Sequence, residues 1–443
     1  MHSFDYRDGK LYCEDIDLAQ AASDLGTPLY IYSASTILDH FTRLNTALAE
    51  LDHLVCYAVK ANSNRAILKL LIDAGAGFDI VSGGELFRVI NAGADPQKCT
   101  FAGVGKTRDE IEYALDRGVH SFNVESEPEL EQINQLAGQK NVRAPIALRV
   151  NPDVNPHTHK YISTGSHENK FGIALAEAPA VYARAARMRN IQIVGIQMHI
   201  GSQITEAGPF AAAVKKVAPL ARDLKSKYGI KFFSIGGGMG IIYRRALESG
   251  SGKWWHDHGS ESAAFSVRDY ANAVIPSLRE LGLRVLIEPG RFIVGNAGAL
   301  LTRVLYIKRA AQKTFAIVDA GMNDLIRPAL YQGYHEIVPV RQPGGMESVP
   351  STQKDDREVV APTTKLDIVG PVCESGDFFA LDREMPELRE GDLLAIMSTG
   401  AYGFTMASNY NSRPLPAEAL VRGDQLKLIR KRQKWEDLVR DET

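Results

Sequence analysis

The sequence predicts an α/β fold in which a (β/α)8 barrel is joined to a second, mainly β domain. In the first two thirds of the chain, eight strand-like runs alternate with helix-like runs, which is typical of a parallel barrel. Beyond residue 296, short strand-like runs are separated by turns and show little helical periodicity; they are residues 299–309, 313–321, 364–372, 392–399 and 425–433. A chain of 443 residues is long enough for two domains. We expect a barrel over residues 36–295 and a β domain, of barrel or sandwich form, from residues 1–35 plus 296–443.

The eight barrel strands are expected in runs rich in β-branched or aromatic residues. They are residues 54–61, 77–82, 99–104, 120–126, 146–152, 193–202, 231–237 and 284–290. The helices carry apolar residues at three-to-four spacing, often with a glycine near the end. They are residues 33–51, 64–76, 83–94, 107–118, 126–138, 174–188, 209–229 and 267–282. Eight such alternations favour a closed, TIM-like barrel over an open sheet.

The alternation of side chains within the strands predicts where the chemistry lies. Several strands have one aliphatic face, suited to packing on helices, and one face of small or polar residues. The polar members come late in their strands: Glu125, Arg149, Asn151, Gln197 and His199. Late inward positions form the carboxyl-terminal mouth of a barrel, where such enzymes hold their reactive groups.

Lys60 is the most unusual residue of the first strand. It shares a face with Leu54, Cys56 and Ala58, and burying an ammonium group without a partner is costly. One interpretation is a lysine whose charged end reaches water from the strand end. The other is a nucleophilic lysine that forms a Schiff base in a partly desolvated site.

Two glycine-rich runs end barrel strands. They are "HIGSQ" (199–203) and "SIGGGMG" (234–240). Glycines let backbone N–H groups approach an anion, and Ser202 adds a hydroxyl donor, so the runs are suited to a phosphate. The alternative is a pair of tight turns.

The run "IEPGR" (287–291) ends the eighth strand and places Glu288 on the inner face. Such a carboxylate could pair with a basic neighbour, or it could bind the protonated ring nitrogen of pyridoxal phosphate. Arg291 could then neutralise a phosphate or a substrate carboxylate. His199 is either a core histidine or a flat ring stacked on a cofactor.

The β region contains its own polar groups: Arg327, Tyr331, Cys373, Glu374 and Tyr402. A free cysteine is usually an inert, small hydrophobic residue. Cys373, however, lies in the polar run "CESGD", where a thiol could serve as a proton donor.

Composition excludes several classes of protein. Lys plus Arg total 51 against 53 for Asp plus Glu, a net charge of −2, which argues against nucleic acid or an anionic membrane as the main partner. The four cysteines lie far apart, without CxxC or metal-ligand spacing, so neither a disulfide framework nor a metal site is expected. The start lacks the apolar core of a signal peptide, and no apolar run is long enough to span a bilayer. We expect a cytoplasmic protein.

An ordered set of motifs between residues 57 and 403 resembles the fold-type III pyridoxal-phosphate decarboxylases. The motifs, in that family's order, are "YAVKAN", "NPDVNPHTHKYISTG", "ENKFGI", "HIGSQ", "GGGMGI", "EPGR", "MNDLIRPALY", "CESGD" and "GAYG". A piece such as "GGG" is unspecific, but the ordered set is highly specific. "HIGSQ", "NPHTHKYISTG" and "CESGD" favour the diaminopimelate branch over the ornithine and arginine branches.

The resemblance implies a pyridoxal 5'-phosphate cofactor and assigns residues to it. Lys60 corresponds to the lysine that binds the cofactor as a Schiff base, and His199 to the residue stacked on its ring. Glu288 corresponds to the partner of the ring nitrogen, and Arg149 to an inward position near the cofactor. The other implied cofactor contacts are Asp79, Ser202, Gly237, Gly238, Pro289, Gly290, Arg291 and Tyr402.

The resemblance also implies substrate contacts and an assembly. The substrate contacts are Arg291, Arg327, Tyr331, Glu374 and Tyr402. The first three correspond to the clamp on the distal carboxylate, Glu374 to the acceptor for the distal ammonium group, and Cys373 to the proton donor. In the family the "CESGD" loop enters the site from a second subunit, so the resemblance implies a homodimer.

The implied activity is decarboxylation of meso-2,6-diaminopimelate to L-lysine and CO2, the last step of lysine biosynthesis. Two alternatives stay open: a decarboxylase of another cationic amino acid (ornithine, arginine or carboxynorspermidine) and a non-catalytic cofactor-binding homologue. The cationic alternatives are disfavoured by Arg327 and Glu374, and the non-catalytic one by the presence of both Lys60 and Cys373.

Two segments fit the pattern less well. Residues 244–266 are longer than the family's usual connection, and they form either a lid, an oligomer contact or a solvated loop with two packed indoles. Their notable side chains, which we do not expect to bind metal, are Trp254, Trp255, His256 and His258. Residues 341–362, rich in Pro, Gly and charge, are expected to be an exposed loop.

Overall fold

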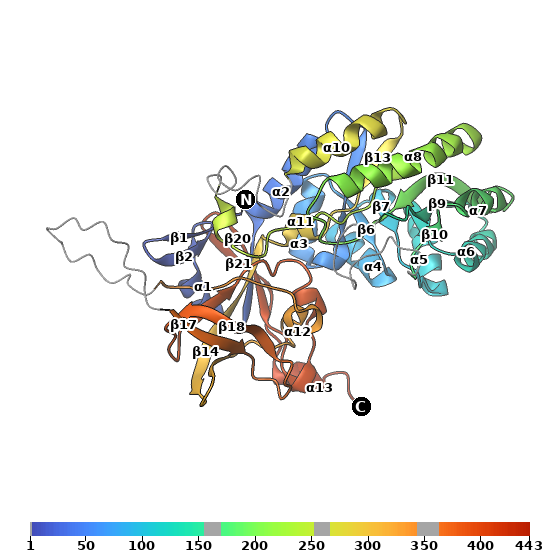
Figure 1. The fold of residues 1–443 in the computed structure, drawn as a ribbon. Helices are drawn as coiled ribbons and strands as arrows, with labels where there is room; N and C mark the ends of the chain where they lie inside the picture. Colours follow the sequence, from blue (N-terminus) through green and yellow to red (C-terminus); the bar gives the residue numbers. More distant parts are fainter. Residues whose placement is uncertain (1, 155–169, 252–265, 343–362) are drawn as a thin grey trace. The chain divides into compact units, whose positions relative to one another are not determined.

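The computed structural model describes residues 2–154, 170–251, 266–342 and 363–443 (Figure 1). The motif at 155–165, the four aromatic residues of the 244–266 segment and most of the 341–362 loop therefore lie outside the described residues. The chain divides into two units, which we call the barrel unit and the β unit. The barrel unit comprises Leu38–Ile241 and His258–Val294, and the β unit comprises Met1–Ile37, Ile242–Asp257 and Gly295–Thr443.

The barrel unit is built on eight parallel strands, and each of them overlaps one of the eight predicted runs. They are β5 (His53–Ala58), β6 (Gly77–Ile80), β7 (Cys99–Phe101), β8 (Ser121–Val124), β9 (Ala144–Asn151), β11 (Ile191–Met198), β12 (Phe232–Ser234) and β13 (Arg284–Ile287). They pair in the order β9-β11-β12-β13-β5-β6-β7-β8, and β8 pairs back with β9, so the ring closes. The predicted (β/α)8 barrel is confirmed. A two-residue strand, β10 (Ile173–Ala174), adds to β9.

One helix precedes the first of these strands and seven lie between them, each at its predicted place. They are α2 (Ala34–Ala47), α3 (Arg65–Asp73), α4 (Gly83–Ala92), α5 (Arg108–Arg117), α6 (Glu127–Gln139), α7 (Ala178–Ala185), α8 (Gly208–Tyr228) and α10 (Val267–Arg279). Capping boxes at Thr107 and Ser266 start α5 and α10, because side chain and backbone satisfy each other's donors there. Left-handed glycines such as Gly118 end several helices. Shorter elements are η1 (Val59–Ala61), η2 (Pro96–Lys98) and α11 (Arg291–Val294).

The interior of the barrel changes from apolar to polar along the strands. Leu54, Cys56, Ala147, Phe232 and Leu286 form one buried cluster inside it. The inward side chains that come later in the strands are polar and still buried: Arg149, Asn151, Gln197, Ser234 and Glu288. The predicted face pattern is therefore confirmed, and the strand ends carry the charged groups.

The β unit is built on one large sheet. Its strands are β4 (Leu29–Ser33), β14 (Gly298–Arg309), β15 (Thr314–Val318), β16 (Ile337–Pro339), β17 (Thr363–Val369), β18 (Phe378–Pro386), β19 (Leu393–Ile396), β20 (Ala417–Arg422) and β21 (Gln425–Arg430). The main path runs β18-β17-β15-β14-β4-β20-β21, while β19 pairs with both β14 and β16. The sequence predicted β14, β15, β17, β19 and β21, and it missed β16, β18 and β20.

The N-terminal segment adds further elements to the β unit. A three-stranded sheet consists of β1 (Phe4–Arg7), β2 (Lys10–Cys13) and β3 (Ile16–Asp17). It is followed by helix α1 (Leu18–Leu25), which Asp17 caps by accepting from the Ala19 N–H at 2.8 Å. Further helices in the described part of this unit are η4 (Glu248–Gly250), α12 (Arg327–Tyr331), η5 (Phe404–Met406), η6 (Tyr410–Ser412) and α13 (Trp435–Val439).

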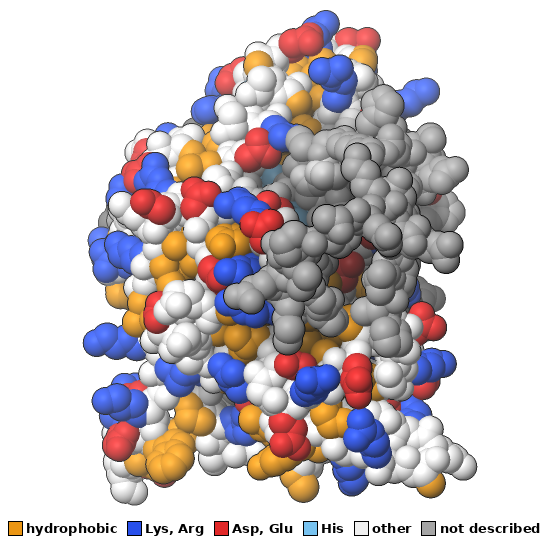
Figure 2. All heavy atoms as spheres, turned by 90° about the vertical axis from the view of Figure 1, so that its left-hand side faces the viewer, with side chains coloured by type: hydrophobic (Ala, Val, Ile, Leu, Met, Phe, Trp, Pro, Cys, Tyr) orange, Lys and Arg blue, Asp and Glu red, His pale blue; other side chains and the backbone are white. Residues whose placement is uncertain are grey.

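The surface agrees with the nearly neutral composition. On the face drawn in Figure 2, acidic and basic side chains are interspersed rather than gathered by sign. Within the described residues, no helix combines the length and apolar character that crossing a bilayer requires.

Candidate active site

Three loops at the carboxyl ends of β11, β12 and β13 are joined by backbone hydrogen bonds. The N–H of Ile204 donates to the Gly238 carbonyl at 2.9 Å, and the N–H of Glu288 donates to the Gly236 carbonyl at 2.9 Å. A Cβ atom at Gly238, whose φ is +111°, would overlap the Gly201 carbonyl oxygen. The two runs predicted to cradle a phosphate therefore lie against each other.

Lys60 follows the end of β5 and is not part of the strand. The strand stops at Ala58, and Lys60 lies in the 3-10 helix η1, with its side chain 43% exposed. The predicted alternation with Cys56 and Ala58 is therefore wrong at this position, because the backbone has already left the extended conformation. The lysine nevertheless lies at the carboxyl end of the barrel, where its Nζ is 3.7 Å from Oδ2 of Asp79. The Ala58 N–H donates to the Pro289 carbonyl at 3.0 Å, which ties this segment to the "EPGR" loop.

Asp79 is a buried carboxylate on β6, 3% exposed. Burial raises its pKa above the ordinary value, and the nearby charges of Lys60 and Arg149 oppose that rise. Its Oδ1 has no hydrogen-bond partner among the residues that the structure describes. A buried acceptor in this position favours a ligand with a donor or a positive charge.

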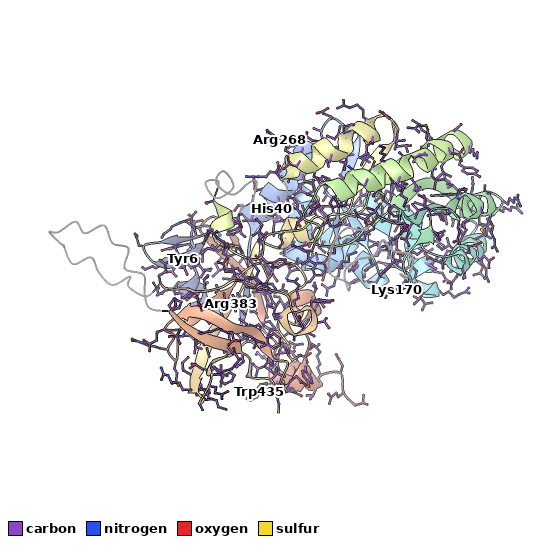
Figure 3. The ribbon with its side chains drawn as sticks, in the orientation of Figure 1. Tyr6, His40, Lys170, Arg268, Arg383 and Trp435 are labelled. Carbon is purple, nitrogen blue, oxygen red and sulfur yellow. The ribbon has the colours of Figure 1, made fainter. Side chains whose placement is uncertain are left out.

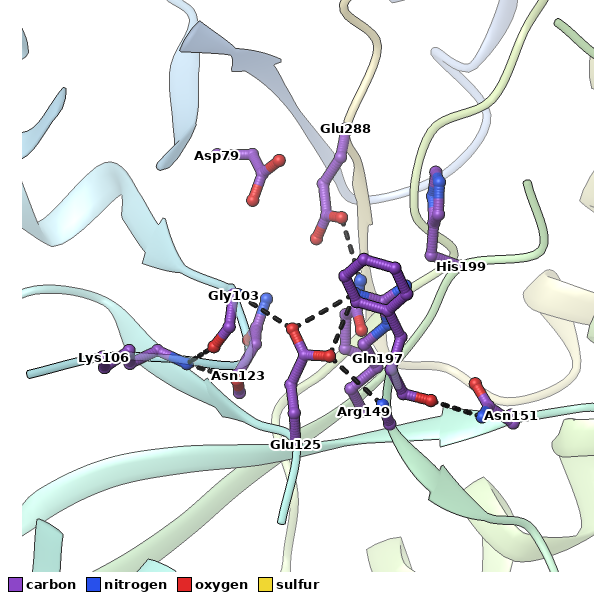
Figure 4. A network of polar contacts seen from close by, with 12 residues as sticks. Asp79, Gly103, Lys106, Asn123, Glu125, Arg149, Asn151, Gln197, His199 and Glu288 are labelled. Carbon is purple, nitrogen blue, oxygen red and sulfur yellow. Dashed lines mark hydrogen bonds and ion pairs between the residues drawn. The ribbon is translucent and has the colours of Figure 1, made fainter. Parts of the chain in front are cut away.

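Glu288 lies after β13 and is 6% exposed (Figure 4). It accepts a hydrogen bond from Oγ of Ser234 at 2.5 Å and another from Nε2 of Gln197 at 3.0 Å. Burial, with a further contribution from the charge of Asp79, raises the pKa of Glu288 to about 7. A cationic group bound beside this carboxylate would stabilise its ionised form.

His199 is a neutral ring at the end of β11. Its Nδ1 accepts from the backbone N–H of Gly237 at 3.2 Å, and because a backbone N–H only donates, the ring proton must be on Nε2. Burial, together with the charges of Arg149 and Lys60, lowers the pKa of His199 well below its usual value. The ring therefore stays flat and uncharged at neutral pH, as stacking on an aromatic cofactor requires.

A second charged pair lies beside these groups (Figure 4). The Glu125 carboxylate accepts from Nη1 of Arg149 at 3.1 Å, from the Gly103 N–H at 2.8 Å and from the Gly172 N–H at 3.1 Å. The Glu125 N–H donates in turn to Glu129 at 2.9 Å. Sequence reasoning placed Glu125 on the inner face but gave it no role. Its position directly after β8 was the available signal.

The remaining predicted cofactor residues of the barrel unit lie on the same loops. Arg291 begins α11 directly after Gly290 and is 7% exposed. Its Nη2 lies 3.3 Å from Oγ of Ser202. A Cβ atom at Gly237 would overlap the Glu288 carbonyl oxygen, so only glycine fits there. Ser202 and Arg291 therefore place a hydroxyl and a guanidinium beside the glycine loops.

In the β unit, the predicted substrate residues lie on short helices and loops. Arg327 and Tyr331 are the first and last residues of α12, and Arg327 is 8% exposed. Tyr402 has a positive φ of 56°, an uncommon conformation for a residue other than glycine. This backbone conformation fixes the direction in which the tyrosine leaves its loop.

The "CESGD" loop connects β17 and β18, and it exposes Cys373 and Glu374. The buried carboxylate of Asp377 holds its base, because it accepts from the N–H of Val372 and from the N–H of Met322, each at 2.6 Å. Sequence reasoning had assigned Asp377 no role. The carboxylate joins the loop of Cys373 to the loop that leads into α12.

The chain is similar to known proteins over its whole length. Residues 34–295 match the family model of the pyridoxal binding domain of pyridoxal-dependent decarboxylases. The fold and the site thus define the class: a decarboxylase that uses pyridoxal phosphate as its cofactor. The diaminopimelate decarboxylase of Pseudomonas aeruginosa is 48% identical over 100% of this chain and 99% of its own length. That of Aquifex aeolicus is 45% identical, covering 98% and 96%.

Solved structures agree with these relatives. Diaminopimelate decarboxylase from Helicobacter pylori, complexed with L-lysine, is 39% identical with a TM-score of 0.85, covering 96% of this chain and 98% of its own. The enzyme from M. jannaschii, in complex with L-lysine, is 34% identical with a TM-score of 0.87, covering 100% and 98%. A lysine/ornithine decarboxylase from Vibrio vulnificus is 20% identical and shares the fold. This chain belongs to the diaminopimelate decarboxylase family, so the resemblance read from its motifs is confirmed.

The residues present fit the cofactor that the family implies. Asp79 leaves a buried acceptor atom without a partner in the described part of the chain. Glu288 is a buried carboxylate that a cationic ring nitrogen would keep ionised. Lys60 supplies an amine, and the glycine loops with Arg291 supply donors for a phosphate. This donor set matches the lysine-reactive carbonyl, basic ring nitrogen and phosphate of pyridoxal phosphate.

Proposed function

We propose that this protein decarboxylates meso-2,6-diaminopimelate to L-lysine and CO2, using pyridoxal phosphate held at the carboxyl end of its barrel. One observation carries the proposal: the amine of Lys60 lies 3.7 Å from a buried carboxylate, Asp79, in a barrel mouth that also contains Glu288. The curated relatives that match over nearly the full chain support this substrate.

The barrel residues divide the work of holding the cofactor. Bound pyridoxal phosphate supplies an electron sink for the electron pair left when CO2 departs. Lys60 would bind it covalently, and Glu288 would keep a proton on its ring nitrogen. His199 would lie against its ring as a neutral imidazole. The residues expected at its phosphate are Ser202, Gly237, Gly238, Gly290 and Arg291.

The residues of the β unit would select the substrate. The distal end of diaminopimelate carries a carboxylate and an ammonium group, and lysine lacks the former. Arg327 and Tyr331 of the β unit, with Arg291 of the barrel unit, would bind the carboxylate, and Glu374 would bind the ammonium group. A site built to pair these charges rejects an analogue that leaves buried groups unpaired. Cys373 would return a proton to the substrate carbon, and Tyr402 would contact both cofactor and substrate.

We also propose a homodimer in which the "CESGD" loop completes the site of the partner subunit. Cys373 and Glu374 are exposed in the single chain, as expected of a loop that a second copy covers. All four cysteines are free thiols, which supports a cytoplasmic location. Mixed dimers of Lys60→Ala and Cys373→Ala chains, dissociated and reassociated together, should regain activity if the sites are shared. If the mixture stays as inactive as either parent, the shared site is refuted.

The activity is tested on purified protein with pyridoxal phosphate. We expect CO2 and L-lysine in equal amounts from meso-diaminopimelate, and little turnover of ornithine, arginine or carboxynorspermidine. If the protein instead prefers one of the other amino acids, that amino acid would be assigned as its substrate. No turnover of any of them by the cofactor-loaded protein would instead favour a non-catalytic homologue.

A further inference from the structure

His335 is a fully buried histidine of the β unit, and both of its ring nitrogens are bonded. It is 0% exposed. Its Nδ1 lies 2.8 Å from the carbonyl oxygen of Met397, and its Nε2 lies 2.8 Å from Nη1 of Arg327. When one nitrogen of a buried imidazole contacts a hydrogen-bond acceptor and the other contacts a donor, the two contacts determine the protonation state of the ring.

The partners of His335 fix its tautomer. A carbonyl oxygen only accepts, so Nδ1 must carry the proton that is donated to Met397. A guanidinium only donates, so Nε2 must be the unprotonated acceptor for Arg327. An imidazolium would place an N–H against the N–H of Arg327. The neutral ring with its proton on Nδ1 is therefore the form that satisfies both contacts.

The backbone around His335 is held by the sheet. The Met397 N–H donates to the Glu336 carbonyl at 2.8 Å, which extends the ladder between β16 and β19 beyond the Ile337–Ile396 pair. The carbonyl oxygen of His335 accepts from Nη1 of Arg383 at 3.1 Å, and Arg383 comes from β18 (Figure 3). The ring therefore has little freedom to follow a neighbour that moves.

Tyr243 completes the support of the same guanidinium. Its ring packs edge-on to His335, with centroids 5.2 Å apart at 82°. The Arg327 guanidinium lies over the Tyr243 ring, 4.8 Å from its centroid. Tyr243 thus fixes the plane in which the guanidinium lies, and His335 fixes its rotation within that plane.

We infer that His335 is a positioning residue that aims the Arg327 guanidinium at the distal carboxylate of the substrate. The inference rests on the proposed function, which gives Arg327 that carboxylate. With one Nη1 hydrogen held by His335, the other N–H groups of the guanidinium point in fixed directions, and a bidentate carboxylate can be recognised without first ordering the arginine. Through Met397, the same ring connects Arg327 to the start of the loop of Tyr402.

The test uses two variants, one that keeps the contact made by Nδ1 of His335 and one that keeps the contact made by Nε2. In His335→Asn, the amide nitrogen can occupy the place of Nδ1 and keep the bond to Met397, but the acceptor for Arg327 is lost. In His335→Gln, the longer side chain returns an amide oxygen to the place of Nε2. We expect His335→Asn to lower kcat/KM for meso-diaminopimelate about 10- to 100-fold, mainly through KM. His335→Gln should recover most of that loss, and both should keep the visible absorbance of bound cofactor.

The coupling to Arg327 is measured by repeating His335→Asn in an Arg327→Ala background. If His335 acts through Arg327, the second substitution should cause no further loss there. Equal losses in the Asn and Gln variants, or losses that add fully in the double variant, would overturn the inference. A wild-type protein that releases no lysine would refute the proposed function instead.

Neutron diffraction on wild-type crystals tests the contact between His335 and Arg327, on which the inference depends, even where the variants do not fold. We expect deuterium on Nδ1 of His335 and none on Nε2. Deuterium on Nε2 would overturn the inference, because the ring could not then accept from Arg327. This measurement needs no turnover, so it is independent of the substrate.

Discussion

In the barrel unit, the charged residues predicted to bind the cofactor are paired with other charged residues at the ends of the strands. In the β unit, the predicted substrate residues lie on a short helix and on loops, and buried side chains support Arg327 and the loop of Cys373. Lys60 lies beside Asp79, and Arg149 lies beside Glu125. In the β unit, by contrast, His335 supports Arg327 and Asp377 supports the loop of Cys373. In a barrel, many side chains point inward at the same level. Charged residues there can therefore pair with residues of opposite charge. A loop must be fixed to the sheet from which it departs.

The largest expected effect falls on the barrel side of this contrast. Lys60→Ala should lower decarboxylation by about 10³-fold or more, because no other group replaces a lost covalent partner. It should also remove the visible absorbance of the bound cofactor. Lys69→Ala, on the exposed face of α3, is the matched control and should leave both unchanged. Retention of cofactor colour and activity by the Lys60 variant would show that the barrel mouth has been misassigned.

Breaking the Glu125–Arg149 pair should cost stability as well as activity. Glu125→Gln leaves a guanidinium that is only 7% exposed beside a neutral amide. Removing one partner of a buried pair typically costs about 4 kcal/mol of unfolding free energy. Glu127→Gln, two residues on and exposed, should cost little. Denaturant unfolding measures both, and equal stabilities would show that the pair is not buried in solution.

Glu288 makes the stability of the cofactor-free protein fall with rising pH. Its pKa is raised from 4.5 to about 7, so the folded state keeps a proton that the unfolded chain releases. The cost of its burial is absent below pH 4.5, grows as pH rises and is complete above pH 7. Cofactor-free Glu288→Gln should therefore exceed wild type by about 3 kcal/mol at pH 8 and by about 1 kcal/mol or less at pH 5. Denaturant unfolding at the two pH values tests this, and a gain independent of pH contradicts it.

The smallest expected effect sharpens the β side of the contrast. Asp377→Asn replaces one of two acceptor oxygens with a donor, so the N–H of Val372 or of Met322 loses its partner. We expect about a tenfold loss of kcat/KM as the loop of Cys373 shifts, with cofactor absorbance unchanged. Asp424→Asn, in the exposed turn between β20 and β21, should behave as wild type. If Asp377→Asn instead lost its cofactor, the division of labour between the two units would be wrong.

The same contrast explains how much the sequence could predict. The barrel strands alternate with helices in the sequence, and this pattern predicted all eight of them. The polar residues at the ends of the strands were predicted as well. The strand β20 was missed because "AEALVR" is rich in helix-forming residues. Its pairing with β4 on one side and β21 on the other decides its conformation.

The positioning residues could not be predicted from single segments of the sequence. Glu125 and His335 act through their contacts with Arg149 and Arg327. No local sequence pattern predicts that these residues are in contact. Lys60 was predicted at the right end of the barrel but on a strand that stops two residues earlier. The alternation of side chains predicts the face of a residue only within a strand. It does not apply to residues after the strand has ended, such as Lys60.

The pairing of β13 with β5 has a consequence for the order in which the protein matures. These strands are the last and the first of the barrel in the chain, and the bond from Ala58 to Pro289 lies at their junction. Lys60 follows one of them and Glu288 follows the other, so the two groups come together only when the ring closes. During synthesis, a chain that has not yet reached β13 contains Lys60 and Asp79 but lacks Glu288. Acquisition of the cofactor's colour would therefore mark the moment at which a nascent chain has closed its barrel.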